Sequence, residues 1–173
     1  TLPVLAALGA SVELASLAGT RTLPFVDFMV GPKRSARRPD EIVTAVIVPI
    51  VDGWQGFAKV GTRNAMVIAV CNAALVVDRP AASVTVAMGS VGPTIVLAPE
   101  ASAYVQDKID WDSMRLVGDA DEVDDVVREF GARCSAAARP IDDHRSTADY
   151  RRHAVGVLGA RLLRRAFVGA AAA

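Results

Sequence analysis

The spacing of apolar residues changes along the chain and separates a strand-rich region from a helical one. Residues 2–8, "LPVLAAL", followed by Gly9, predict the end of a helix and its stop. "SVELAS" and "RTLPF" then alternate around "LAGT", which is typical of a β-hairpin. "EIVTAVIVP" is a continuous β-branched run and predicts a buried strand.

A polar segment, "GPKRSARRPDE", separates the hairpin from that strand and predicts a loop, because it contains glycine and two prolines. Its basic part, "PKRSARR", has the charge to meet a phosphate, although the neighbouring Asp40 and Glu41 favour an ordinary solvated loop. Residues 49–53 follow the strand and are the best candidate for a domain boundary.

Three further strand-like runs follow this boundary, at residues 54–62, 66–77 and 83–90. "VDRPA" separates the second run from the third and predicts a turn. Because short turns join antiparallel neighbours, the three runs predict a three-stranded antiparallel sheet.

From about Pro99 the apolar spacing becomes helical. "PEASAYVQD" begins with Pro and Glu, as helices often do. Two longer helices are predicted, one at 121–138 and one after Ser146, which forms a Ser-x-x-Asp capping pattern with Asp149. The expected apolar faces consist of Val123, Val126, Val127, Phe130 and Cys134 in the first helix, and of Tyr150, Ala154, Val157, Leu158, Leu162 and Ala166 in the second.

This order of elements predicts an α+β fold. Each helix has one apolar stripe to bury, so about three helices should pack on one face of the three-stranded antiparallel sheet. The region before residue 54 supplies a helix end, a hairpin and a strand of a separate α+β subdomain.

Composition narrows the class of protein without indicating a function. Hydrophobic residues make up 52% of the chain, and 19 Lys+Arg against 19 Asp+Glu give no net attraction for nucleic acid or an anionic membrane. The longest apolar run, 65–77, is too short to span a bilayer. The N-terminus has neither a basic signal region nor an initiator Met, which suggests a truncated or processed chain. Cys71 and Cys134 are far apart and fit small buried side chains in a reducing cytoplasm.

Few residues offer chemistry of their own. His144 follows two aspartates that could touch a metal, but a solvated loop at a helix entry is the simpler interpretation. His153 lies one helical turn after Asp149, which favours a surface pair. "GSVGP" has two glycines, yet its proline lacks an N–H, so it predicts a turn rather than a phosphate loop. These patterns predict no catalytic residue and no metal site.

Five stretches nevertheless occur in the order and spacing of a known family. They are "LPVLAALGASVEL", "RTLPFVDFMVGPKRSARRPDEIVTAVIVP", "FAKVGTR" with "IAVCNAAL", "VTVAMGSVGPTIVLAPEA" and "IDDHRSTADYRRHAVGVLGARLLRRA". Together they resemble the FAD-binding (medium) subunit of the molybdenum hydroxylases, the group of carbon monoxide dehydrogenase and xanthine dehydrogenase. The resemblance covers nearly the whole chain.

The resemblance implies a flavoprotein subunit that takes electrons from iron–sulfur clusters and passes them through FAD to an acceptor. It implies two partners in a cytoplasmic hetero-oligomer, namely a large molybdenum-binding subunit with the molybdenum cofactor and a small iron–sulfur subunit. It also implies that residues 1–53 are the C-terminal part of an FAD-binding domain, and that residues 54–173 are a carbon monoxide dehydrogenase flavoprotein C-terminal-like domain.

The same resemblance gives two candidate cofactor-binding residues. In the family, the residue matching Lys59 approaches the flavin ring and the residue matching Val43 packs near it. A lysine there favours the anionic reduced flavin, whereas the alternative is that Lys59 extends from a sheet edge into water. Arg63 is expected to pair with a carboxylate or to cover the sheet. The chain departs from the family at Val67, where an Asp is usual, and at Arg37, where a Leu is usual.

Two functions of different classes follow from these observations. The first is the electron-transfer flavoprotein subunit. The second is a truncated non-catalytic module that only docks partner subunits. The family's two Gly-Gly flavin loops, which hold the pyrophosphate with backbone N–H groups, are absent from these residues, so we expect the chain by itself to bind FAD weakly.

Overall fold

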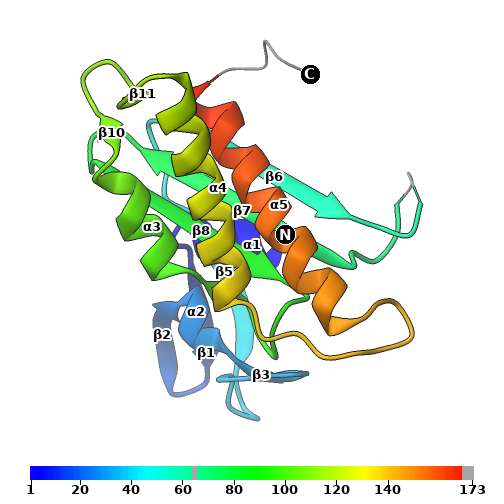
Figure 1. Ribbon diagram of the computed structural model, residues 1–173. Helices are drawn as coiled ribbons and strands as arrows, with labels where there is room; N and C mark the ends of the chain where they lie inside the picture. Colours follow the sequence, from blue (N-terminus) through cyan, green and yellow to red (C-terminus); the bar gives the residue numbers. More distant parts are fainter. Residues whose placement is uncertain (64–65, 169–173) are drawn as a thin grey trace.

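The N-terminal region forms a small antiparallel sheet next to a short helix. The computed structural model describes residues 1–63 and 66–168. The three-stranded sheet has the order β2-β1-β5, with β1 antiparallel to both neighbours (Figure 1). The elements of this region are α1 (Leu2–Ala7), β1 (Ser11–Ser16), β2 (Gly19–Pro24), α2 (Phe25–Phe28), β3 (Met29–Gly31), β4 (Arg34–Ser35) and β5 (Ile42–Ile47).

The predicted helix end and hairpin are confirmed, and two other predictions for this region are wrong. The segment predicted as a plain loop contains β4 and the turn that joins it to β3, and in this turn Lys33 has a φ of 56°. The strand predicted to be buried, β5, is exposed along most of its length, although Glu41 just before it is buried. β5 is an edge strand, and among the described residues no element covers its apolar side chains.

The second sheet has four strands in the order β6-β7-β8-β9, all antiparallel. The sequence predicted three of them and missed β9, which has only two residues and therefore no readable alternation. The second predicted strand begins at Cys71 rather than at Met66, whose side chain is fully exposed. The strands are β6 (Gln55–Val60), β7 (Cys71–Asp78), β8 (Ser83–Gly89) and β9 (Val96–Leu97).

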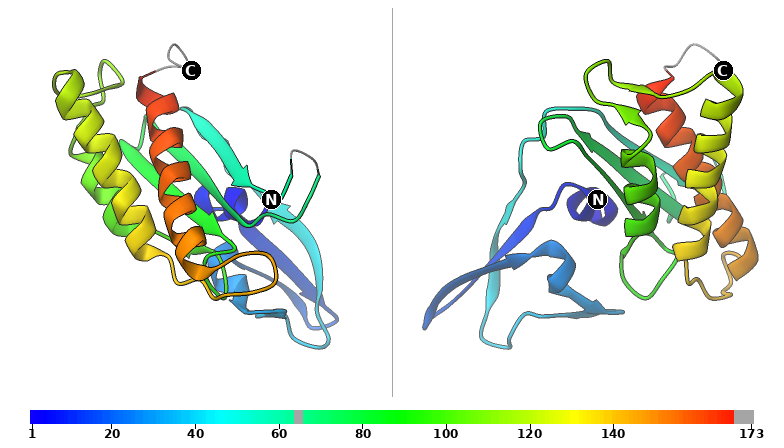
Figure 2. Two further views of the ribbon diagram at one scale, coloured as in Figure 1. Left: turned by 45° about the vertical axis from the view of Figure 1, so that its right-hand side comes forward. Right: turned by 60° about the vertical axis from the view of Figure 1, so that its left-hand side comes forward.

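Three helices cover one face of this sheet, as predicted. Figure 2 shows α3, α4 and α5 side by side on that face, with α1 and the small sheet on the opposite face. Alternation along β7 explains the two layers, because Leu75 and Val77 belong to the helix-side core and Ala74 and Val76 to the core around α1. The helices are α3 (Pro99–Gln106), α4 (Ala120–Ala137) and α5 (Ala148–Phe167), and a two-stranded hairpin, β10 (Ile109–Asp110) with β11 (Arg115–Leu116), joins α3 to α4.

Caps define where the two long helices begin. Asp119 and Glu122 form a capping box at the start of α4. The cap of α5 is Thr147, whose side chain accepts from the backbone N–H of Tyr150, so the cap predicted at Ser146 is wrong by one residue. Within residues 1–63 and 66–168, no helix combines the length and the apolar character needed to cross a bilayer.

The apolar face of α5 is wider than predicted. Leu158 and Leu162 are buried as expected, but Tyr150 is 50% exposed. Val155 and Leu163, which lie outside the predicted stripe, are fully buried. α5 contacts both α4 and the sheet, so it buries two faces rather than one. At the α4–α5 crossing, Gly131 and Gly156 meet so closely that a Cβ on either would lie 2.8 Å from the other's carbonyl oxygen.

Candidate functional site

Val43 lies on β5, on the small sheet. It pairs with Leu14 of β1, next to an irregularity in the register between Glu13 and Leu14. Its side chain is 45% exposed, so it offers an apolar surface that nothing in the described chain covers.

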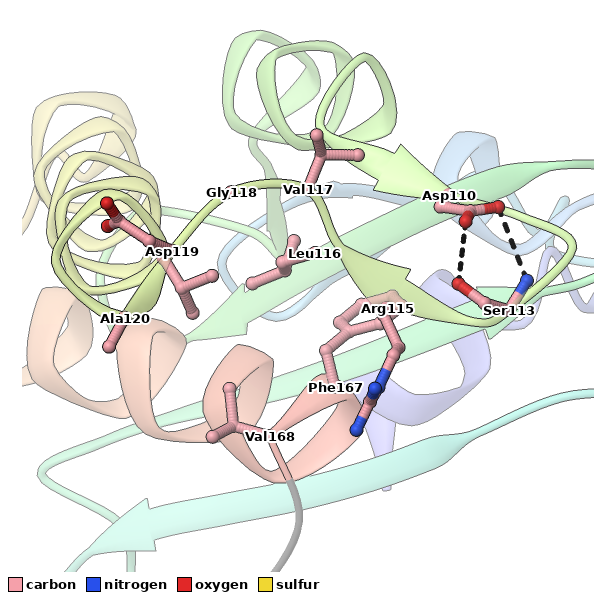
Figure 3. Close-up of a pocket in the computed structure, with 11 residues that line it drawn as sticks. Asp110, Ser113, Arg115, Leu116, Val117, Gly118, Asp119, Ala120, Phe167 and Val168 are labelled. Carbon is pink, nitrogen blue, oxygen red and sulfur yellow. Dashed lines mark hydrogen bonds between the residues drawn. The ribbon is translucent and has the colours of Figure 1, made fainter.

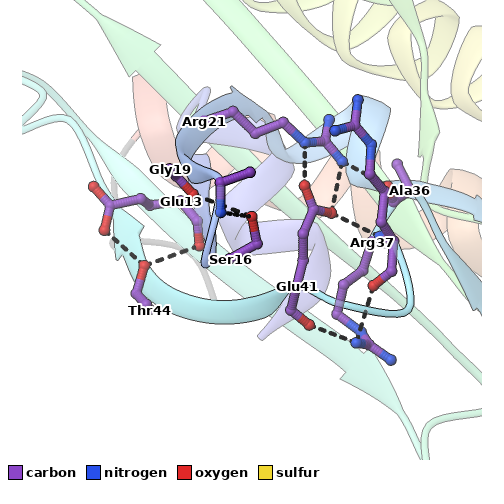
Figure 4. Close-up of polar contacts among 10 residues, drawn as sticks. Glu13, Ser16, Gly19, Arg21, Ala36, Arg37, Glu41 and Thr44 are labelled. Atoms are coloured by element: carbon purple, nitrogen blue, oxygen red, sulfur yellow. Dashed lines mark hydrogen bonds and ion pairs between the residues drawn. The ribbon is translucent and has the colours of Figure 1, made fainter.

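The carboxylate of Glu41 fixes the start of β5. It accepts two hydrogen bonds from Arg21, at 2.6 Å from Nε and 3.0 Å from Nη2, and one from the backbone N–H of Arg38 at 2.6 Å (Figure 4). The hydrogen bonds from Arg21, followed by that from Arg38, lower the pKa of Glu41 to about 2. This bidentate pair ties the 36–41 loop to β2.

Arg37 strengthens the same loop. Its guanidinium donates to the carbonyl oxygen of Glu41 at 2.5 Å and to that of Arg38 at 3.1 Å. The residue that departs from the family pattern therefore helps to hold the loop that leads into Val43. The position of Glu41, directly before a β-branched run, was a detectable signal for this cluster, but the prediction of a solvated loop did not use it.

Lys59 lies on β6, at the edge of the larger sheet. Ala58 and Val60 pack against the helix-side core, so Lys59 and the half-exposed Phe57 point to the other face. Lys59 Nζ donates to the carbonyl oxygen of Val67 at 3.1 Å. β6 is a sheet edge, as the alternative prediction of a lysine that extends from an edge into water requires. The ammonium group nevertheless contacts a backbone carbonyl of the chain.

Asn72 is the cross-strand partner of Lys59 and shares its face. Its Oδ1 atom is buried and has no hydrogen-bond partner in the described part of the chain. The amide of Asn72 lies near Gly89 of β8 and Pro3 of α1, so its Oδ1 atom is enclosed by the chain. Arg63 is exposed, and the structure shows no ion pair for it within residues 1–63 and 66–168.

Helix N-termini in the described residues are poorly suited to cradle a pyrophosphate. α1 and α3 each have a proline in the first turn, Pro3 and Pro99, and proline lacks the N–H donor that a phosphate site uses. The N-termini of α4 and α5 are already capped by Asp119 and Thr147. These four helix N-termini therefore offer no ready cradle for the phosphates of a dinucleotide.

A cavity of about 510 Å³ lies between the β10–β11 hairpin, the start of α4 and the end of α5 (Figure 3). Its carboxylates have structural roles. Asp110 closes the hairpin turn by accepting from Ser113 Oγ at 2.7 Å and from the N–H of Asp112 at 3.0 Å, and the hydrogen bonds from Ser113 lower its pKa. Asp119 caps α4. We assign no chemistry to this cavity.

The cysteines and His153, which the sequence analysis also considered, show no arrangement that indicates chemistry. Both cysteines are buried, and burial raises the pKa of Cys71 to about 11 and that of Cys134 to about 12. His153 is exposed, and Asp149 pairs with Arg152 instead of with it. No cluster of three metal-ligating side chains occurs in the described residues.

Comparison with known proteins places these features in a family. Residues 1–51 match the FAD binding domain in molybdopterin dehydrogenase, and residues 57–166 match the CO dehydrogenase flavoprotein C-terminal domain. The glyceraldehyde dehydrogenase medium chain of Sulfolobus acidocaldarius is 30% identical over 158 residues, which are 90% of this chain and 52% of that one. This chain therefore belongs to the FAD-binding medium subunits of the molybdenum hydroxylase family.

Solved structures agree with this assignment. The CO dehydrogenase from Oligotropha carboxidovorans superposes with a TM-score of 0.78 at 26% identity, over 98% of this chain and 56% of that one. Quinoline 2-oxidoreductase from Pseudomonas putida 86, at 22% identity and a TM-score of 0.79, shares the fold over 98% of this chain and 56% of its own. The chain spans about half the length of these relatives.

Proposed function

We propose that this chain forms one wall of the flavin site in a molybdenum hydroxylase flavoprotein subunit, with Lys59 and Val43 as residues on the ring side. The observation that carries the proposal is the free face of β6, where the exposed, cationic Lys59 lies on the same side of the strand as the half-exposed Phe57. FAD, when bound, supplies the redox chemistry. The chain's own residues orient the ring and set the charge around it.

The wider role follows from the family. Electrons would enter from iron–sulfur clusters on a small partner subunit, fed by the molybdenum cofactor of a large one, and would leave through FAD to an acceptor. Residues 1–53 would contribute to the FAD-binding domain and residues 54–173 would form the C-terminal domain of a cytoplasmic hetero-oligomer. An ammonium group beside the ring stabilises negative charge that develops on reduction, so Lys59 would raise the flavin potential.

A second function, a non-catalytic module that docks partner subunits, is favoured by one specific observation. The apolar side chains of β5, among them Ile42, Val46 and Ile47, are about half exposed or more. Exposed apolar patches mark interaction sites on soluble proteins.

Flavin titration separates the two functions. The chain alone should be colourless and should bind FAD only at concentrations on the order of millimolar, because ring-side contacts must offset the entropy of holding a flexible dinucleotide. Supplying the family's two flavin loops, in cis or in trans, should give tight binding. Micromolar, stoichiometric quenching of flavin fluorescence by the chain alone would show that the phosphate site lies within these residues.

The role of Lys59 is tested on the flavin-loaded protein. Lys59→Ala should lower the flavin midpoint potential by on the order of 20 mV, the two-electron equivalent of about 1 kcal/mol for an exposed charge. Lys59→Arg keeps the charge and should preserve the potential. Lys108→Ala removes an exposed lysine elsewhere and serves as the control. If Lys59→Ala and Lys108→Ala give the same potential, Lys59 is not beside the ring and the docking function gains support.

A further inference from the structure

A second cavity, also of about 510 Å³, lies where the 89–93 turn, the loop after α4 and the start of α5 meet. Lys59 is not among its lining residues. Pro32, from the turn of the β3–β4 hairpin, contributes to its wall. The charged groups that line it are three arginines and one aspartate: Arg139, Arg145, Arg151 and Asp143. The cavity therefore has three guanidinium groups and a single carboxylate.

That carboxylate is already engaged by the chain, and it accepts four hydrogen bonds. Asp143 Oδ2 accepts from Arg145 Nη2 at 3.0 Å. Asp143 Oδ1 accepts from Arg151 Nη2 and from the backbone N–H groups of Arg145 at 2.8 Å and Ser146 at 3.2 Å. The guanidinium of Arg139 contacts only neutral carbonyl oxygens, at the end of α4. Positive charge at the cavity thus exceeds the negative charge that the described residues supply.

Two guanidinium donors at this cavity are buried without a partner. The Nε atoms of Arg145 and Arg151 have no hydrogen bond in the described chain, and the side chain of Arg151 is only 4% exposed. Arg151 is held in place by its bond to the carbonyl oxygen of Ser90 at 3.0 Å, so it cannot easily turn toward water. A buried, unpaired charged donor is costly, and such groups commonly indicate an ion or water that satisfies them.

We propose that this cavity binds a carboxylate, with Arg145 as the main contact and Arg151 as its buried support. The walls favour a carboxylate over a phosphate. Three of the lining residues are prolines, Pro32, Pro93 and Pro140, which offer no backbone N–H to a phosphate cradle. Together with Ile141 they form an apolar surface, which suits a singly charged acid with a hydrocarbon body. The carboxylate belongs either to a small free acid or to an acidic side chain of a bound protein.

The experiment follows the arginine Nε–H resonances of the chain by NMR during a titration with sodium acetate, with chloride adjusted to hold ionic strength constant. The resonances of Arg145 and Arg151 should shift and saturate at acetate concentrations on the order of millimolar, whereas that of Arg128, on the exposed surface of α4, should not. Arg145→Gln should weaken acetate binding about tenfold or more. Arg161→Gln removes an exposed charge elsewhere on α5 and should leave the binding unchanged.

A capped Gly-Glu-Gly peptide, titrated in parallel, separates the two sources of the carboxylate. Saturation by acetate or by the peptide supports the site, and the tighter of the two identifies a free acid or a protein side chain. Tighter binding of inorganic phosphate than of acetate would overturn the carboxylate assignment. Unsaturable shifts, or an equal loss of binding in Arg145→Gln and Arg161→Gln, would show that the arginines form no site. None of these results bears on the proposed flavin site at Lys59 and Val43.

Discussion

β5 and β7 are both predominantly apolar strands, yet β7 is buried and β5 is exposed. β7 lies inside the four-stranded sheet, with α5 packed on one face and α1 on the other, and nearly all its residues are buried. β5 is an edge strand whose residues are mostly exposed. An apolar run therefore predicts a strand, whereas the burial of that strand depends on which elements pack on its faces.

Different forces accordingly hold the two regions together. The larger sheet and its helices share one continuous apolar core, which includes Phe130 and Leu162. The N-terminal region has a small core around α1 and relies in addition on the ion pair of the buried Glu41 with the partly exposed Arg21. Mutations should therefore affect the two regions by different mechanisms and by different amounts.

The largest effect is expected in the helix-side core. Leu162→Ala should lower the free energy of unfolding by roughly 2–5 kcal/mol, because the side chain is 1% exposed and its removal leaves a cavity between α5 and the core. Urea denaturation followed by circular dichroism measures the loss. A change below about 0.5 kcal/mol would mean that α5 does not pack on the sheet as described.

The crossing of α4 and α5 should respond to added volume. Gly156→Ala places a Cβ 2.8 Å from the carbonyl oxygen of Gly131, so the helices must separate. Overpacking costs about 1–3 kcal/mol and the better helix propensity of Ala recovers about 1, which leaves a net loss of about 1 kcal/mol. Gly31→Ala, in strand β3, adds the same methyl group where it meets only ordinary contacts, and it serves as a control for the effect of the substitution without overpacking. Stabilisation by Gly156→Ala would disprove the close approach.

Much of this architecture was predictable because local patterns decide it. Strands β6 and β8 and helices α3 and α4 have clear alternation, helical spacing or caps, and the structure has them close to the predicted bounds. β9 and β10 are two residues long, so they have no period to detect. The exposure of β5 and of Tyr150 was not predictable, because it depends on distant elements.

The candidate site was less accessible to sequence reasoning. The positions of Lys59 and Val43 came from the family resemblance alone, and their contact with flavin stays a prediction. The bond from Lys59 to the Val67 carbonyl depends on how the 61–70 segment folds back, which no local pattern encodes. The Glu41 pair joins residues 20 positions apart, and the Asp143 pair with Arg151 combines a loop and a helix.

Acid should weaken the N-terminal region through Glu41. Its pKa is lowered from 4.5 to about 2 in the folded chain, so its stabilising contribution is complete above pH 4.5 and disappears as the pH falls toward 2. Arg21→Gln removes the main cause of the low pKa, so the folded-state pKa of Glu41 should shift back toward 4.5 and the loss of stability that this group causes between pH 4.5 and pH 2 should become smaller. Unfolding free energies measured between pH 6 and pH 2 test the shift, and an unchanged loss in Arg21→Gln would contradict the pairing.

The smallest effect is expected on β5. Val46→Ala should change the free energy of unfolding by no more than about 0.5 kcal/mol, because its side chain is 46% exposed and no helix covers it. Val86→Ala, in β8, removes the same group from a 1% exposed position and should cost roughly 1.5–3 kcal/mol. Both variants are measured by urea denaturation at several protein concentrations. An equal loss in the two variants that grows with protein concentration would show that β5 is buried by association in solution. The difference in burial between β5 and β7 would then hold only for the isolated chain.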